Sequence, residues 1–393
     1  MKYKDLLEKY KEGLVSEEEK LIVEQDIEKY EAIEEYLSDI MDDEFVDLTE
    51  LTNMGKNTDE TLKLKKSVNK RLRKVVFSSV ATVLALLFAV FFIISPFIDN
   101  LYYNPSKISV GKTDKDIDFD LKAITELNMP GYTVSTTHVE RQRFGTYDID
   151  YFYRNTFNNN DYNVSSKIKR GEIYSTKKDI YDSNFIFIDV QIPNRERKYI
   201  DEQKDEVLNH IKQLNPVSYV SVALTFEDDL TMEELYNLES KYSNVRFIWT
   251  GIRVDSPDTK TKDSIGIQLN GDGVHLDDDI EEKYKAFTIL KWLVDPVGSG
   301  NSDKPLKAQA YELHYKSLLQ YVIDRKEAVN VIERRPWKSE FYQSALKYAK
   351  NYGVKTYGVL VYAEAKDLIE LVENEQVKLL EFNEAMVSRK NIQ

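Results

Sequence analysis

Residues 75–98 read VVFSSVATVLALLFAVFFIISPFI, a stretch of 24 residues without one charged side chain. An α-helix of this length spans about 36 Å, enough to cross a hydrocarbon core of about 30 Å. The stretch starts deep in the chain and is too long for the apolar core of a cleavable signal peptide. Helices in the core of a globular domain seldom stay uncharged for so long. The sequence therefore predicts one transmembrane helix.

The charges on the two sides of this stretch are distributed unevenly. Residues 1–62 contain 20 acidic residues against seven lysines, whereas residues 63–74 contain seven basic residues and no acid. An excess of Lys and Arg beside a membrane helix stays on the cytoplasmic side, and basic residues there attract anionic lipid headgroups. We therefore expect a single-pass protein of the cell membrane, anchored in the lipid bilayer, with a cytoplasmic N-terminus and an extracytoplasmic C-terminal region.

The composition of the whole chain excludes several classes of function. The 393 residues include 68 acidic and 54 basic residues, 42% hydrophobic residues and no cysteine. This is the composition of folded protein, and its acidic balance argues against direct nucleic-acid binding. The lack of cysteine excludes disulfides, thiolate metal sites and Cys nucleophiles, and the four histidines show no metal-ligand spacing. We expect no enzyme activity and no catalytic, metal or cofactor site.

Residues 1–62 are expected to form a small all-α acidic head. A short helix closes near Gly13, and Ser16 followed by Glu19 has the capping-box spacing that starts a second helix. Apolar residues then recur every three or four positions, which places them on one helix face. These residues are Val23, Ile27, Tyr30, Ile33, Leu37 and Ile40. The face is expected to form a partner interface or its supporting core; a self-sufficient hairpin or a coiled-coil dimer is the alternative.

This head resembles the cytoplasmic domain of bacterial anti-sigma factors. Members that bind zinc carry a His followed by Cys residues four and seven positions later, and the matching positions here are Asp26, Tyr30 and Ile33. The resemblance implies a zinc-free version. In it, Tyr30 and Ile33 would fill by packing the space that a metal otherwise ties together.

Beyond the apolar stretch, the chain is expected to form an α+β region with helices packed on a mixed sheet. Apolar runs predict strands over residues 185–192, 218–226, 245–254 and 356–363. Helical periodicity predicts helices over residues 231–243, 306–332, 338–351 and 366–380, the first begun by a capping box of Thr231 and Glu234. The expected divisions are the head 1–62, the basic segment 63–74, the membrane helix 75–98, a first outer module 99–200 and a C-terminal α+β domain 201–385.

The outer segments resemble the sigma factor regulator family of low-GC Gram-positive bacteria. The resemblance is carried in order by residues 130–134 (PGYTV), 144–148 (FGTYD), 222–226 (VALTF), Leu235, 247–249 (FIW) and 351–359 (NYGVKTYGV). It implies a membrane-anchored anti-sigma factor that sequesters an extracytoplasmic-function sigma factor and releases it on an outer signal.

A single helix is a poor rod for transmitting a conformational change across the membrane. Release by a protease or by loss of an outer-face signal partner is therefore expected. The alternative is a membrane-anchored receptor or binding module without a sigma factor partner.

Overall fold

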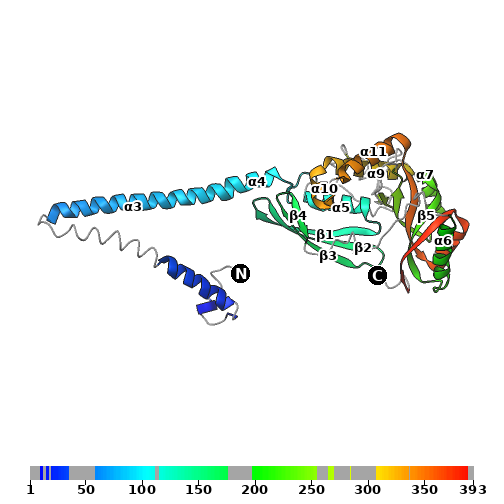
Figure 1. The fold of residues 1–393 in the computed structure, drawn as a ribbon, viewed down its shortest axis with the longest axis horizontal. Helices are drawn as coiled ribbons and strands as arrows, with labels where there is room; N and C mark the ends of the chain where they lie inside the picture. The colour runs from blue at the N-terminus through cyan, green and yellow to red at the C-terminus, as the bar shows by residue number, and fades with distance from the viewer. Residues whose placement is uncertain are drawn as a thin grey trace, which may run out of the picture. The chain divides into compact units, whose positions relative to one another are not determined.

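The structure is a computed structural model that describes residues 9–11, 15–16, 19–34, 58–110, 115–175, 197–254, 264–269, 284, 307–335 and 337–387. The chain forms two compact units, Met1–Leu86 and Leu87–Gln393, and each is described by itself (Figure 1). The first contains the acidic head and most of the apolar helix. The second contains the end of that helix and the α+β region.

The acidic head is helical in its described part, with a short helix at residues 9–11 and a longer one at residues 19–34. The predicted capping box starts the longer helix. The amide of Glu19 donates a hydrogen bond to Ser16 Oγ at 3.3 Å, and the Ser16 amide donates to the Glu19 carboxylate at 3.0 Å. These bonds give acceptors to two backbone amide groups at the start of the helix that have no partner within the helix itself.

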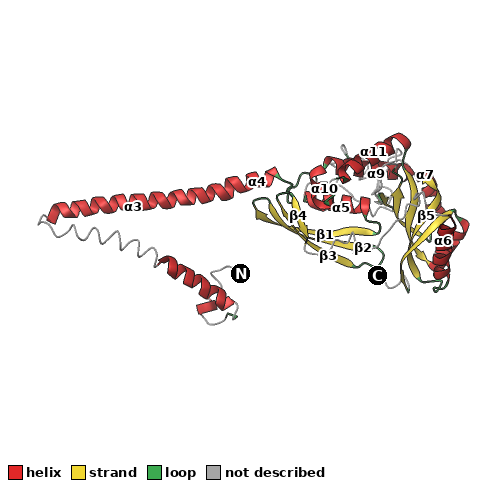
Figure 2. Cartoon of the chain, in the orientation of Figure 1, coloured by secondary structure: helices red, strands yellow, loops and turns green. Residues whose placement is uncertain are grey.

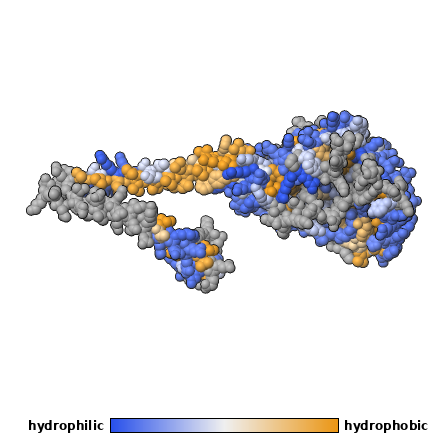
Figure 3. Space-filling view, in the orientation of Figure 1, coloured by the Kyte–Doolittle hydropathy of each residue, from blue (hydrophilic) through white to orange (hydrophobic). Residues whose placement is uncertain are grey.

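The apolar stretch forms one continuous helix of three parts: α3 (Thr58–Ala89), the π-helical turn η2 (Val90–Ile94) and α4 (Ser95–Leu101). Among the described residues this is the one helix long and apolar enough to cross a membrane. Its hydrophobic surface is exposed along the helix (Figure 3). The predicted membrane helix is thus present. The wide π-helical turn ends two residues before Pro96, which lacks an amide hydrogen, and the helix continues through the proline to Leu101.

The first sheet of the outer unit is a four-stranded antiparallel meander that was not predicted from the sequence. Its order is β1-β2-β3-β4, and its strands are β1 (Tyr132–Arg143), β2 (Thr146–Asn155), β3 (Asp161–Lys169) and β4 (Glu172–Ser175). Two-residue turns, Phe144-Gly145 and Arg170-Gly171, connect β1 to β2 and β3 to β4. All four of these residues have positive φ angles, the pattern of type I′ hairpin turns with glycine second.

The second sheet has five strands in the order β7-β6-β8-β5-β9. Figure 2 shows the yellow strands of this sheet around β5, with the red helices α6 and α7 beside them. The strands are β5 (Tyr219–Thr231), β6 (Arg246–Ile252), β7 (Gly266–Gln268), β8 (Lys355–Glu364) and β9 (Val377–Met386). The helices beside it are α6 (Arg197–Lys212), α7 (Met232–Lys241), α9 (Lys307–Asp324), α10 (Lys326–Glu333), α11 (Lys338–Tyr352) and α12 (Ala365–Asn374). The predicted α+β class is confirmed. In the described part of the chain every strand pair is antiparallel, which corrects the expected mixed sheet.

Most predicted elements of this second half are present. The strands expected at 218–226, 245–254 and 356–363 correspond to β5, β6 and β8, and α7 begins with the complete capping box of Thr231 and Glu234. The strand expected at 185–192 lies outside the described residues.

Two predicted helices differ from the structure. The stretch 306–332 is interrupted at Arg325, whose φ and ψ of −96° and 33° are not helical, so its described part forms α9 and α10. The helix predicted over 366–380 is wrong in its second half, because α12 ends at Asn374 and β9 follows. There, Val377 and Leu379 alternate in the buried positions of a strand that pairs with β5.

Helix α5 (Asp116–Asn128) was also missed, although it is the most deeply buried helix of the outer unit's first part. Ten of its thirteen residues are buried, among them the acidic residues Asp116, Asp120 and Glu126. One continuous hydrophobic core includes apolar residues of α5 and of both sheets. The buried acidic residues of α5 form hydrogen bonds with several other parts of the outer unit.

Candidate functional site

The apolar face of the head helix is largely exposed in the structure. Val23 is fully buried, whereas Tyr30 and Ile33 have exposed fractions of 69% and 58%, and Ile27 is also exposed. Leu37 and Ile40 lie outside the described residues. The packing role that the resemblance implied for Tyr30 and Ile33 is therefore corrected: these side chains face outward. Large exposed apolar side chains side by side are typical of a surface that another molecule covers.

One further member of this face was missed from the sequence. Ile22 is exposed and precedes Ile33 by eleven residues, about three helical turns, so both project from the same side. The three- and four-residue spacing was counted from Val23, so the neighbouring residue Ile22 at the edge of the face was left out. Leu21 is also exposed, but it lies on the opposite side of the helix from Tyr30.

Acidic side chains surround the exposed face. The helix at residues 19–34 carries six acidic residues and two lysines. Both lysines take part in exposed ion pairs, Lys20 with Glu24 at 3.8 Å and Lys29 with Asp26 at 3.1 Å. Such pairs contribute little to stability and leave a clear excess of negative charge around the apolar residues.

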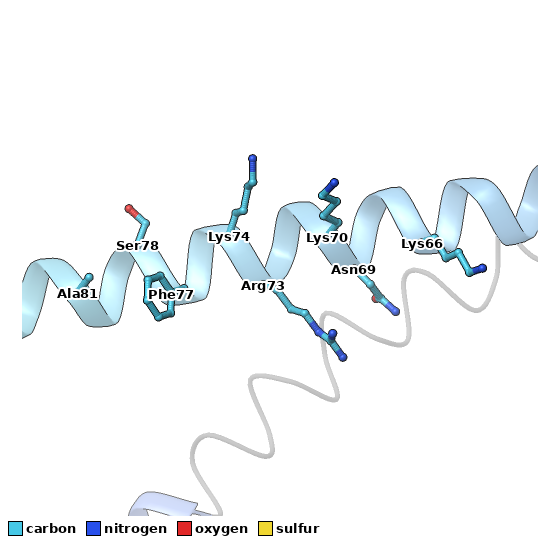
Figure 4. A pocket seen from close by; sticks show the side chains of 8 residues that line it. All are labelled: Lys66, Asn69, Lys70, Arg73, Lys74, Phe77, Ser78 and Ala81. Atoms are coloured by element: carbon cyan, nitrogen blue, oxygen red, sulfur yellow. The ribbon is translucent and has the colours of Figure 1, made fainter.

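The basic segment before the membrane span is helical and solvent-exposed. A shallow hollow along it is lined by Lys66, Asn69, Lys70, Arg73, Lys74, Phe77, Ser78 and Ala81 (Figure 4). Lys70 and Lys74, four residues apart, extend to the same side of the helix, while Arg73 extends to another. Basic side chains spread around the helix in this way suit the phosphates of a lipid surface that surrounds it.

In the outer unit, Asp120 of α5 binds three side chains that arrive from elsewhere in the chain. Its carboxylate accepts hydrogen bonds from the hydroxyls of Tyr103 at 2.8 Å and Tyr321 at 2.7 Å. The guanidinium of Arg325 donates to both carboxylate oxygens, from Nε at 2.8 Å and from Nη2 at 2.7 Å. This bidentate pair holds the break between α9 and α10 against α5.

The protonation states of this cluster follow from its burial and its charges. Burial raises the pKa of Tyr321 well above its ordinary value, and the negative charge of Asp120 raises it further, so Tyr321 remains a neutral donor. Burial acts to lower the pKa of Arg325, but its hydrogen bonds to Asp120 and the charge of that carboxylate outweigh the effect and raise the pKa. Arg325 therefore stays charged.

Glu126, further along α5, connects this helix to the second sheet. Its backbone carbonyl accepts a hydrogen bond from Nε1 of Trp249 in β6 at 2.7 Å. Its carboxylate accepts from the backbone amide of Gln268 in β7 at 3.1 Å and lies 2.7 Å from Nε2 of His314 in α9. Helix α5 is thus the element through which the strands β6 and β7 and the helices α9 and α10 are joined.

The end of the apolar helix is attached to the first sheet by two buried polar residues, Ser95 and Asp99. The Asp99 carboxylate accepts hydrogen bonds from the Gly145 amide at 2.6 Å and from Nε of Arg141 at 2.9 Å, and it also contacts Nη2 of Arg141. Ser95 Oγ accepts the amide of Phe144 at 3.1 Å. The helix end and the β1–β2 turn are therefore held together by four hydrogen bonds.

Among the described residues, no group of three or more His, Asp or Glu side chains is placed to hold a metal ion. His314 lies against Glu126 inside the protein, as part of the contacts around α5. The outer unit thus builds around α5 a set of structural contacts between parts that are distant in sequence.

Comparison with known proteins agrees with this description. Residues 211–384 match the family described as sigma factor regulator C-terminal, slightly less than half of the chain. The matched range runs from the end of α6 into β9 and includes nearly the whole second sheet. No curated protein and no solved structure matches the chain.

The fold and this match define the class: a membrane-anchored regulatory protein with one apolar helix and an α+β C-terminal region. Over residues 211–384 the chain is similar to the sigma factor regulator family. Of the motifs that carried the resemblance, VALTF (222–226) in β5 and FIW (247–249) in β6 lie inside the matched range, whereas residues 130–134 and 144–148 precede it. The family is a regulatory one, and the match supports an anti-sigma factor regulatory role with a sigma factor as the general partner.

Proposed function

We propose that the chain sequesters an extracytoplasmic-function sigma factor through its acidic head and releases it when the outer unit receives a signal. The observation that supports this is the exposed apolar face formed by Ile22, Ile27, Tyr30 and Ile33, surrounded by acidic side chains. Sigma factors use basic, partly apolar surfaces to bind DNA and polymerase. An acidic helix with an apolar face competes for such surfaces by charge and by specific contact.

The proposed orientation puts the head in the cytoplasm, where the sigma factor is. Seven basic residues lie in segment 63–74, directly before the apolar stretch, whereas Asp99 and Asn100 follow it. The Lys and Arg bias supports a cytoplasmic N-terminus and an extracytoplasmic C-terminal region. A sigma factor bound to the head is then held at the membrane, away from its promoters.

Release is proposed to start in the outer unit, through a protease or through loss of an outer partner. The hydrogen bonds of Asp99 and Ser95 attach the first sheet to the end of the membrane helix. A change in the outer unit can therefore expose or strain the segment where the helix leaves the bilayer. Cleavage or partner loss at that place needs no long-range movement along a single helix.

The test is recovery of the sigma factor with the full-length chain purified from membranes. The variant Tyr30→Asp with Ile33→Asp places two charges in the apolar face, and we expect at least about a tenfold loss of bound sigma factor. The matched control is Leu21→Asp with Ala32→Asp, which adds the same charge to exposed positions on the side of the helix opposite Tyr30. If the face variant and the control retain equal amounts of sigma factor, the interface is wrongly assigned.

A second comparison separates this function from that of an anchored receptor without a sigma factor. Residues 1–74 are replaced by an unrelated membrane anchor of the same orientation, and transcription of the genes under the sigma factor's control is measured. We expect transcription to rise, because the sigma factor is no longer held. Unchanged transcription would favour the receptor.

A further inference from the structure

The end of the first sheet that meets the membrane helix consists of two hairpin turns side by side. The β1–β2 turn contains Phe144-Gly145, and the β3–β4 turn contains Arg170-Gly171. The amide of Arg170 donates a hydrogen bond to the carbonyl of Gly145 at 2.7 Å, so the two turns are joined. The first position of a type I′ turn normally holds Asn, Asp or Gly, yet here Phe144 and Arg170 occupy it with positive φ. Such unfavourable positions are often retained for function.

These turns lie at a depth set by the helix. About 20 helical residues cross a hydrocarbon core of about 30 Å, and counted from Lys74, the last basic residue before the apolar stretch, they end at Ile94. Phe91 then occupies the last apolar turn. The guanidinium carbon of Arg143 lies 5.1 Å from the centre of the Phe91 ring, and the Phe144 ring lies 6.0 Å from it. The β1–β2 turn therefore reaches the layer of the lipid headgroups.

The side chains at this end of the outer unit suit that layer. Arg143, Lys169 and Arg170 are exposed and basic. Glu172, the first residue of β4, is acidic and accepts a hydrogen bond from Tyr174. Exposed aromatic side chains lie on the helix end and on β4, namely Phe97, Tyr102 and Tyr174. Aromatic residues favour the boundary between hydrocarbon and headgroups, and basic residues favour anionic phosphates.

We propose that Arg143, Lys169 and Arg170 form a lipid-binding edge that binds the phosphates of anionic phospholipids in the leaflet on the outer side. The edge fixes the first sheet on the membrane surface, with Asp99 and Ser95 holding the β1–β2 turn against the helix. This inference rests on the proposed insertion and orientation of the apolar helix. Two features support anionic phospholipids as the partner of this edge: its positive charge complements theirs, and it adjoins the helix that is proposed to enter the bilayer.

The test uses the cysteine-free full-length chain, in which one introduced cysteine gives one labelled position. Gln142→Cys places a fluorophore at the lipid-binding edge, and Asn160→Cys places it in the loop at the other end of the sheet. Each protein is inserted into vesicles of phosphatidylcholine alone or with about one third phosphatidylglycerol, containing lipids with a headgroup quencher. We expect stronger quenching at residue 142 in the anionic vesicles and little change at residue 160.

A triple variant identifies the groups responsible. Arg143→Gln, Lys169→Gln and Arg170→Gln should remove most of the difference between anionic and neutral vesicles, since each basic residue near an anionic surface favours binding about fivefold. The matched control, Lys326→Gln, Lys347→Gln and Lys350→Gln, removes the same charge from exposed helix positions of the C-terminal domain and should keep the difference. Equal quenching at residue 142 in both kinds of vesicle, or a triple variant that behaves like the control, would overturn the proposal.

Two further readouts separate the causes of a negative result. A label at Leu86→Cys, in the middle of the apolar stretch, should be quenched by lipids with a quencher deep in the acyl chains; without that quenching, the membrane placement and the lipid-binding edge are both wrong. Soluble polyphosphate added to neutral vesicles should leave the fluorescence of the label at residue 142 unchanged. If polyphosphate shields this label from the quencher, the edge binds a soluble polyanion and not a lipid surface. The triple variant should bind the sigma factor through its head as the unsubstituted chain does. A failure of the proposed sigma factor binding can therefore be told apart from a failure of the lipid-binding edge.

Discussion

Arg141 and Asp99 are 42 residues apart in sequence, and their side chains pair where the apolar helix ends against the first sheet. The Asp99 side chain is 2% exposed and that of Arg141 45% exposed. A carboxylate so close to an apolar stretch is costly to bury unless its hydrogen-bonding capacity is used. Here the guanidinium and the Gly145 amide use it. The end of the apolar helix is therefore firmly attached to the first sheet of the outer unit.

Asp99→Asn should loosen this attachment. The substitution removes the charge that strengthens the hydrogen bonds to Arg141, and we expect a loss of about 1–3 kcal/mol in the free energy of unfolding of the outer unit. The loss stays moderate because Arg141 can return to water. Thermal unfolding of the full chain in detergent measures it. The control is Asp148→Asn, which breaks the exposed pair with Lys167 and should cost less than about 1 kcal/mol. Equal effects of the two variants would contradict the structural role of Asp99.

Asp120→Asn should be more damaging, because it removes the charge of a buried carboxylate that binds the half-buried guanidinium of Arg325. Breaking a buried ion pair from one side costs about 3–5 kcal/mol. Denaturant unfolding of the full chain is expected to show this loss. Asp118→Asn, two residues away in the same helix, removes an ion pair with Lys122 at 2.6 Å near the surface and should cost less than about 1 kcal/mol. If Asp120→Asn is as mild as this control, α5 does not connect the parts of the outer unit as described.

The outer unit should lose stability at high pH through Tyr147. Burial raises the pKa of Tyr147 to about 12, and the nearby charge of Asp99 adds to the effect. The folded protein thus holds this proton more tightly than the unfolded chain, whose tyrosine has a pKa of about 10. The resulting stabilisation is complete below pH of about 10 and is lost as the pH rises towards 12.

Tyr147→Phe removes this contribution while keeping the ring. We expect the variant to lose less stability than the unsubstituted chain between pH 10 and 12 (about the two pKa values), with similar stability near pH 7. Comparing unfolding free energies at several pH values measures the difference. Parallel pH profiles for the two proteins would show that Tyr147 does not titrate as described.

Local signals in the sequence predicted local structure well. The capping boxes at Ser16 and Thr231 involve residues three positions apart, and both are present. The apolar run 75–98 needs no partner to be recognised. Strands β5, β6 and β8 are buried along most of their length, so they read as continuous apolar runs.

Helix α5 was missed because its environment depends on residues far away in the chain. Asp120 and Glu126 look like solvent-exposed positions, but their partners Tyr321 and His314 follow 201 and 188 residues later. No pattern within α5 announces these partners. The exposure of Tyr30 could likewise not be predicted from the helical period. The period shows which residues share a face, but it does not show whether another part of the protein covers that face.

The acidic head and the outer unit are proposed to face opposite sides of the membrane. Because the chain has no cysteine, this arrangement can be tested in intact cells with single-cysteine variants and a maleimide that does not cross membranes. Glu34→Cys marks an exposed position of the head, and Asn160→Cys marks an exposed position of the outer unit. We predict labelling of residue 160 in intact cells and of residue 34 only after lysis. Labelling of residue 34 in intact cells, with residue 160 protected, would contradict the account.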